Sequence, residues 1–389
     1  MRAYTRSIEF DYITWSIDAF YIKLGQAALG DQHYLDTGRQ TEIVKTYLQM
    51  VSRLGQIEAE IDRMYTDPSI NDPDASAAAL RAERDRLRET LNQMIPLCEA
   101  ILQQQMNATL AELGFTLGGQ SLPPLLYHAT PLPDGLIISP REVIRQEANI
   151  SLNPDMPLES IIKLEQEVEK GLNVSALVVG IGGVGVYPTM VMRSSDLFWF
   201  TETIAHEWIH NYLTLRPLGI SYEVSPELRT MNETTASIAG KEIGQAMLKR
   251  FYPEFLPPPP PVPPIEQGNA PPEPAQNLPA AFDFRAEMHE TRVRVDALLA
   301  EGKIEAAETY MEMRRKMFWE NGYQIRRLNQ AYFAFHGAYA DVPGGEAGAD
   351  PVGPAVRALR QQSRTLAEFV NRISWMTSFE QLQRAIQAQ

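Results

Sequence analysis

The sequence is poor in cysteine and in basic residues, and each shortage excludes a class of protein. The single cysteine, Cys98, among 389 residues excludes an internal disulfide and any cysteine-rich metal site. Lys and Arg number 35 against 49 Asp and Glu, which gives a net charge of −14. Binding to nucleic-acid phosphates requires clustered cations, so this acidic balance argues against a nucleic-acid partner.

Long apolar runs are also missing. No stretch approaches the ~20 apolar residues that a membrane-spanning helix needs. The fairly apolar segment from Ile13 to Leu29 carries Asp18 and Lys23, and no signal-peptide pattern is visible. We therefore expect a cytoplasmic protein with no membrane span in this chain. A membrane-anchored or exported protein is the alternative if residues before Met1 are missing.

The first ~115 residues have the periodicity of helices. From Thr41 to Tyr65, apolar residues recur at three- and four-residue steps and form one stripe. A turn-forming segment at 66–74 follows, with two prolines and three aspartates, and helical sequence resumes over 75–113. These two segments are expected to form an antiparallel helical hairpin.

Between Leu122 and Met192 the pattern changes to short apolar runs bounded by Pro and Gly, which is typical of strands. Beyond 255 the sequence is divided by a proline-rich loop. The expected elements are strands at 125–129 and 135–139, a helix at 157–172, a hairpin or two adjacent strands at 175–192, helices at 196–214 and 233–252, a loop at 256–280, helix over 281–340, a loop at 343–354 and helix over 356–389.

The segment from His206 to His210 reads His-Glu-Trp-Ile-His and has the clearest chemical meaning. On a helix, His206 and His210 lie one turn apart on one face, so both imidazoles can reach one zinc ion. Glu207 lies beside the first ligand and can reach a metal-bound water. Random placement of residues gives roughly 0.008 matches to His-Glu-x-x-His here. The alternative is a pair of structural histidines beside a surface glutamate.

A catalytic zinc site needs a third protein ligand and one open position. The pair Asn232-Glu233 follows His210 after turn-forming residues, so a second helix starting near Glu233 can present that carboxylate to the metal. The alternative role for Glu233 is to stabilise the N-terminal end of its helix. Close approach of the two helices is favoured by small residues, namely Ala236, Ser237, Ala239 and Gly240.

HEWIH followed by MNETTASIAG resembles the gluzincin metallopeptidases, the thermolysin-like and aminopeptidase-like clan. In that clan the ligands are two histidines on one helix and a glutamate from an Asn-Glu-x-x-Ala or Asn-Glu-x-x-Ser motif on the next. The resemblance implies one Zn²⁺ per chain, bound by His206, His210 and Glu233. It also implies that Glu207 is the general base in the hydrolysis of a peptide or protein substrate.

Several further expectations depend on the same resemblance. Glu202 and Ser237 are expected to hydrogen-bond the ligands, because a ligating histidine usually donates its other N–H. Residues 175–192 would include the edge strand that pairs with an extended substrate. Gly180–Gly185 also matches G-x-G-x-x-G, but a strand follows where a dinucleotide site needs a helix. We therefore expect a flexible or close-packed hairpin there.

The choice between endopeptidase and aminopeptidase stays open, because the glutamate with which the clan's aminopeptidases bind the substrate amine is missing between Gly185 and Met192. The oxyanion donor is expected on residues 328–339, a segment similar to one in uncharacterised bacterial proteins assigned as aminopeptidases. The candidates there are Tyr332, His336 and Tyr339, with packing in the core as the alternative role.

Together these observations predict a predominantly helical α+β fold. An N-terminal helical hairpin and a small sheet would flank the active-site helix, and the C-terminal half would be helical. The predicted domains are a helical domain at 1–115, a metallopeptidase core at 116–255, the proline-rich loop at 256–280 and a helical domain at 281–389. The competing function is an inactive zinc-binding helical scaffold or interaction protein; the intact Glu207 argues against it.

Overall fold

The computed structural model of the chain describes residues 2–66, 72–154, 156–257, 282–323, 325–336 and 351–387. Most of the predicted loops at 256–280 and 343–354, and the candidate Tyr339, lie outside the described residues. Helix accounts for 67% of the described residues and strand for 10%, which confirms the predominantly helical α+β class. None of the described helices has the length and apolar content needed to cross a bilayer.

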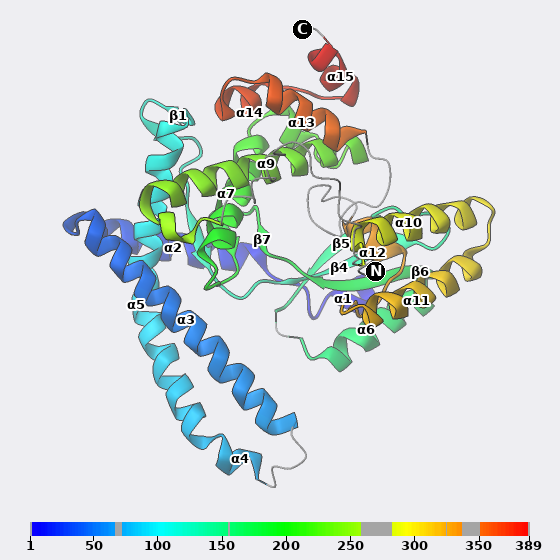
Figure 1. Cartoon of the computed structure of the whole chain (residues 1–389), viewed down its shortest axis with the longest axis horizontal. Coiled ribbons are helices and arrows are strands. Elements are labelled where there is room, and N and C mark those ends of the chain that lie inside the picture. The colour runs from blue at the N-terminus through cyan, green and yellow to red at the C-terminus, as the bar shows by residue number, and fades with distance from the viewer. Residues whose placement is uncertain are drawn as a thin grey trace, which may run out of the picture.

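The N-terminal hairpin is formed by two long helices, α3 (Thr37–Thr66) and α5 (Ala78–Glu112), which lie side by side in Figure 1. The apolar stripe predicted from the sequence faces the partner helix, and Tyr47, Leu54 and Ile57 are buried. The hairpin is therefore confirmed. Shorter elements accompany it: α1 (Arg2–Thr5), α2 (Tyr12–Leu29), the 3-10 helix Asp31–Tyr34 and α4 (Pro73–Ser76).

The larger sheet has the order β5 (Ala148–Leu152), β4 (Asp134–Pro140), β6 (Val174–Gly180), all antiparallel. Successive residues of a strand face opposite sides. Leu136 and Ile138 therefore pack under α6 (Leu158–Leu172), whereas Ile137 packs under α12 (Gln330–His336). Helices thus cover both faces of this sheet.

The smaller sheet lies beside the central helix α7 (Leu197–Thr214) and has the order β3 (Tyr127–Ala129), β8 (Thr189–Val191), β7 (Gly183–Val184). β3 and β8 are parallel, and β7 and β8 form an antiparallel hairpin. The segment 175–192, predicted as a hairpin or two adjacent strands, is divided between two sheets, because β6 pairs with β4 and only β7 and β8 form a hairpin. A two-stranded ribbon, Thr116–Leu117 with Gln120–Ser121, completes the strands of the described residues.

Helix α7 packs against α9 (Pro226–Phe251) at the centre of the molecule (Figure 1). The largest apolar core extends from this pair to α3 and α5 and to the C-terminal helices. A second core joins α10 and α11. The elements that complete the fold are α8 (Pro217–Ile220), the 3-10 helix Pro253–Phe255, α10 (Phe284–Ala300), α11 (Ile304–Glu320), α13 (Val352–Gln362), α14 (Leu366–Ser374) and α15 (Phe379–Gln387).

A buried ion pair ties α2 to α5 and β3. Lys23 Nζ lies 2.6 Å from Glu99 Oε2, and these side chains are only 3% and 4% exposed. The other oxygen of Glu99 accepts the backbone N–H of Ala129 and lies 2.9 Å from His128 Nδ1. Burial alone raises the pKa of Glu99, but the charge of Lys23 and the contact with His128 outweigh it and lower this pKa to about 2.

We predict that Glu99→Gln destabilises the protein by about 3 kcal/mol, because it leaves the Lys23 ammonium buried and unpaired. The folded-state pKa of Glu99 is depressed, so the stabilisation is fully present above its ordinary value of 4.5 and is lost as the pH falls toward 2. Urea unfolding followed by circular dichroism over this pH range measures the difference between the two proteins.

The matched control is Glu42→Gln, since Glu42 makes an exposed ion pair with Arg39. Exposed pairs contribute less than about 1 kcal/mol, so this variant should unfold almost as the wild type does. Equal stabilities of the Glu99 and Glu42 variants would show that the buried pair does not hold α2 in place.

Candidate metal centre

Helix α7 carries the two histidines in a well-anchored frame. Its first turn is capped by Asp196, whose side chain accepts the N–H of Trp199 at 3.1 Å. Apolar residues around the two histidines, among them Ile204 and Trp208, are at most 1% exposed. The helix therefore has a fixed rotation about its axis, with His206 and His210 together on one face.

Helix α9 begins seven residues before Glu233, so the expectation that it starts near Glu233 is wrong. Ser225 caps it by accepting the N–H of Leu228, and Pro226 occupies the first helical position. The helix dipole acts mainly within the first turn. Glu233 lies beyond that turn, so it does not serve as a carboxylate that stabilises the helix end.

The backbones of α7 and α9 are in direct contact at two glycines. A Cβ atom on Gly240 would lie 2.9 Å from His206 N and Glu202 O, and one on Gly244 would lie 2.9 Å from Glu202 N. Real Cβ atoms essentially never approach other atoms this closely. The predicted close approach of the two helices is therefore confirmed, and it places Glu233 opposite the histidines.

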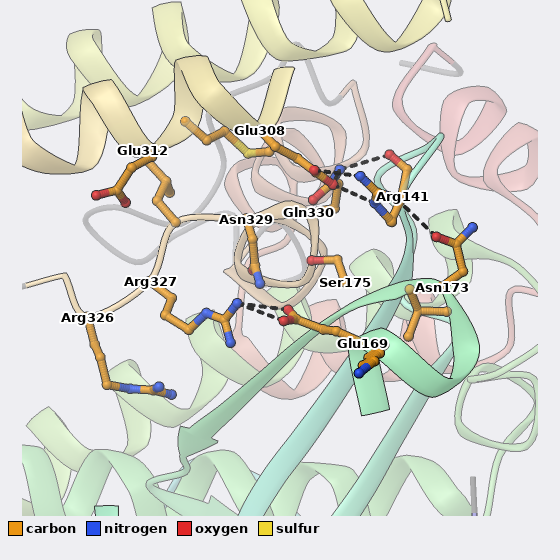
Figure 2. Close-up of a pocket in the computed structure, with 14 residues that line it drawn as sticks. Arg141, Glu169, Asn173, Ser175, Glu308, Glu312, Arg326, Arg327, Asn329 and Gln330 are labelled. Atoms are coloured by element: carbon orange, nitrogen blue, oxygen red, sulfur yellow. Dashed lines mark hydrogen bonds and ion pairs between the residues drawn. The ribbon is translucent and has the colours of Figure 1, made fainter. Parts of the chain in front are cut away.

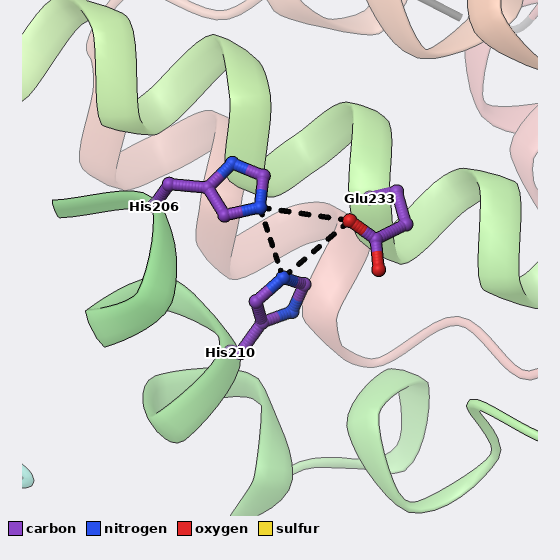
Figure 3. Close-up of side chains that lie close together, drawn as sticks. All are labelled: His206, His210 and Glu233. Atoms are coloured by element: carbon purple, nitrogen blue, oxygen red, sulfur yellow. Dashed lines mark hydrogen bonds and ion pairs between the residues drawn. The ribbon is translucent and has the colours of Figure 1, made fainter. Parts of the chain in front are cut away.

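The three predicted ligands converge (Figure 3). The two Nε2 atoms of His206 and His210 are 3.1 Å apart, and each lies 3.5 Å from Glu233 Oε2. Ligand atoms that surround a tetrahedral zinc ion at ~2.0–2.1 Å are themselves about 3.3 Å apart. Glu233 Oε2 is buried and has no hydrogen-bond partner. Two imidazole nitrogens and this carboxylate oxygen therefore fit a zinc ion in both chemistry and spacing.

Hydrogen bonds orient two of these ligands. Asn232 Oδ1 lies 2.8 Å from His210 Nδ1, so an N–H there donates to it and leaves Nε2 free to bind a metal. The Tyr222 hydroxyl donates to Glu233 Oε1 at 2.5 Å, which leaves Oε2 as the free oxygen. The expected roles of Glu202 and Ser237 are wrong, since neither bonds a ligand histidine in the described part of the chain.

Neither of the two orienting residues was predicted from the sequence. Asn232 had a signal, because it immediately precedes the predicted ligand within the Asn-Glu motif. Tyr222 had none, because it lies in the irregular segment between α8 and α9 and only the folded chain brings its hydroxyl to Glu233.

The predicted base, Glu207, is covered by the backbone of β7. A Cβ atom on Gly183 would lie 2.6 Å from Glu207 Cγ and Oε1, and one on Gly185 would lie 3.0 Å from His210 Cβ. Gly183 and Gly185 thus allow the hairpin to pack closely against α7. This agrees with the close-packed alternative expected from the sequence.

Burial and charge act together on these groups. Burial raises the pKa of Glu207; the nearby histidines oppose this and Glu233 adds to it. Burial lowers the pKa of His210, but the charge of Glu233 outweighs it and raises this pKa to about 9. Burial opposes ionisation of Glu233, yet His210 and His206 hold its pKa well below the usual range. Glu233 is therefore ionised and available as a ligand.

The expected oxyanion donors occupy a different place. Tyr332 and His336 lie on α12, against β4 and β6, and their rings are 4.2 Å apart. Burial lowers the pKa of His336 to about 4 and raises that of Tyr332 to about 12. The structure brings neither of these described side chains to the ligand cluster, and Tyr339 lies outside the described residues.

The charge of Glu207 also acts on Tyr12, a residue that the sequence did not suggest. Its hydroxyl donates to Ser151 Oγ at 2.7 Å. Burial raises its pKa, the bond to Ser151 opposes this, and the charge of Glu207 adds a smaller increase. The first residue of α2 therefore lies within electrostatic range of the predicted base.

A polar cavity of about 500 Å³ lies apart from this centre, between α6, α11 and the residues before α12 (Figure 2). Its arginines already have carboxylate partners: Arg141 pairs with Glu308, and Arg327 with Glu165 and Glu169. These pairs join the residue after β4 to α11, and α6 to the segment before α12. None of the predicted site residues lines this cavity.

Comparisons of the chain with protein-family models, with curated proteins and with solved structures found no match. The assignment of a function therefore depends on the residues of the centre and on their geometry.

We predict that Gly240→Ala lowers both the melting temperature and the zinc affinity, because the added methyl group forces α9 away from His206. Gly55→Ala is the matched control: a Cβ atom there meets nothing within 4 Å. Replacing this exposed helical glycine should stabilise the protein by roughly 0.5–1 kcal/mol. Calorimetry and zinc titration test both variants, and unchanged zinc affinity in Gly240→Ala would contradict the proposed role of the contact.

Proposed function

We propose that the chain is a zinc-dependent peptidase of gluzincin type that hydrolyses bonds in a peptide or protein substrate. The observation that supports this most is the spacing of the three ligand atoms, 3.1, 3.5 and 3.5 Å, at a buried carboxylate oxygen that lacks a hydrogen-bond partner. Two histidines and one glutamate leave a fourth position open, as catalytic zinc sites require.

When bound, zinc would supply a Lewis acid that lowers the pKa of water to ~7 and polarises a carbonyl. The chain's own residues would do the rest. His206, His210 and Glu233 hold the ion, while Asn232 and Tyr222 fix the orientation of two of these ligands. Glu207 accepts a proton from the attacking water and passes it to the leaving amine.

The environment of Glu207 suits this task. Its raised pKa moves the carboxylate toward the range in which it can both accept and return a proton near neutral pH. The backbone of β7 keeps the side chain in one place beside the ligands. A zinc-binding scaffold without activity would need the three ligands but no buried carboxylate beside them, which favours the peptidase.

The substrate in this proposal is a polypeptide. The cytoplasmic location, expected because the sequence shows no membrane span and no signal-peptide pattern, stays a prediction.

The first prediction from this proposal concerns metal content. The purified wild type should carry about one zinc per chain, whereas His210→Ala and Glu233→Ala should each lose most of it, because two ligands hold zinc far more weakly than three. Plasma mass spectrometry measures this directly. The control is His289→Ala on the exposed surface of α10, which should retain zinc. Zinc absent from the wild type even after incubation with the metal would contradict the proposal.

A second prediction separates the base from the ligands. Glu207→Gln should keep its zinc and lose about 10²–10⁴-fold in turnover of a fluorescence-quenched peptide library, because a proton acceptor and not a ligand is removed. Glu227→Gln, an exposed position in the first turn of α9, should behave as the wild type. Wild-type turnover in the Glu207 variant would remove this residue from the mechanism and leave the scaffold as the better account.

A further inference from the structure

Helix α2 buries a charged side chain and exposes large apolar ones, which is the reverse of an ordinary surface helix. Its buried residues are Ala19 and Lys23, which face α5. Seven large apolar residues of α2 are exposed, including Ile22 and Leu29, and five of the seven form what is here called the outer stripe. They are Ile13, Ile17, Phe20, Tyr21 and Leu24, which are 76%, 52%, 45%, 68% and 50% exposed.

Helix α2 cannot rotate about its axis to bury the outer stripe, because contacts at both ends fix its orientation. Lys23 is fixed by its 2.6 Å ion pair with Glu99, and the Gln26 amide donates to the same carboxylate at 3.0 Å. At the other end, Tyr12 donates to Ser151. Rotating α2 would take the Lys23 ammonium away from its buried partner and leave two uncompensated buried charges, which is strongly destabilising. The stripe therefore stays on the surface of a single chain.

The spacing of the stripe is that of a helix-packing seam. Ile13, Ile17, Phe20 and Leu24 follow one another at steps of four, three and four residues. An average step near 3.5 keeps apolar residues on one side of a helix against a second helix, as in coiled coils. The occupant that fits this pattern is another α-helix.

The charge of the helix disfavours a lipid surface. Helices that lie on membranes carry Lys and Arg beside their apolar face. The only charged residues of α2 are Asp18 and Lys23, and Lys23 is buried. The chain as a whole has a net charge of −14 and would be repelled by anionic lipids. A helix of matching apolar character is the better partner.

We infer that the partner is a second copy of this chain, with α2 packed against α2 about a two-fold axis. A symmetric dimer needs a patch that is complementary to itself, and an uncharged apolar stripe meets this condition. Aromatic side chains such as Phe20 and Tyr21 offer roughly 150–250 Å² each, and with the three aliphatic residues the half-exposed stripe presents on the order of 500 Å² per copy. Two copies then bury about 1,000 Å², the lower limit for a specific interface.

This inference does not depend on the peptidase proposal, because no residue of the outer stripe belongs to the metal centre. Sedimentation equilibrium of the full chain should give a dimer at micromolar concentration. Phe20→Glu and Ile17→Glu should each raise the dissociation constant by more than about 30-fold, since truncation or charging of a central contact costs 2 kcal/mol or more.

Val293→Glu is the matched control, because Val293 is also 52% exposed but lies on α10. It should remain a dimer, and circular dichroism should show all three variants folded. A monomeric wild type at 100 μM, or dimers that persist in both stripe variants, would overturn the inference. Binding of the wild type to neutral phosphatidylcholine vesicles that Phe20→Glu abolishes would also overturn it, in favour of a lipid partner.

Discussion

At Gly240 and Gly244 only a hydrogen atom fits between helices α7 and α9, and this contact sets the position of everything around the centre. Helix packing normally keeps axes 8–10 Å apart because side chains separate them. Here backbone meets backbone, so the Glu233 carboxylate reaches His206 and His210 without strain on a long side chain. The N-terminal hairpin and the C-terminal helices then pack around the joined pair in one core.

Much of the centre could be predicted because its signals are local. His206 and His210 are separated by one helical turn, and the apolar residues between them specify which face is buried. The stripe of α3 likewise predicted its packing against α5, since a 3.6-residue period requires no knowledge of distant residues. Periodicity alone could not predict Glu233 as the third ligand. That prediction depended on the Asn-Glu pair and on the small residues that follow it.

Other features depended on contacts between distant segments. Ser225 and Pro226 were interpreted as a turn, although together they cap and start α9. The Tyr222 hydroxyl contacts Glu233 only in the folded chain, where the segment between α8 and α9 lies against α9. Tyr332 and His336 share one helical face, as predicted, but periodicity cannot tell which neighbour that face meets, and it meets the sheet. Helix α2 buries Lys23 and not its apolar residues, because Lys23 pairs with Glu99 on α5. The sequence of α2 alone does not reveal this partner.

The glycine contact also has a consequence for recognising distant relatives of this chain. Loops and surface helices can diverge freely, whereas a side chain at Gly240 or Gly244 would move α9 away from α7 and separate Glu233 from the two histidines. The ordered pattern of His-Glu-x-x-His, a glutamate after 22 intervening residues, and glycines 7 and 11 residues beyond it combines ligand chemistry with steric fit. A search for that pattern can identify homologues whose overall similarity has faded below detection.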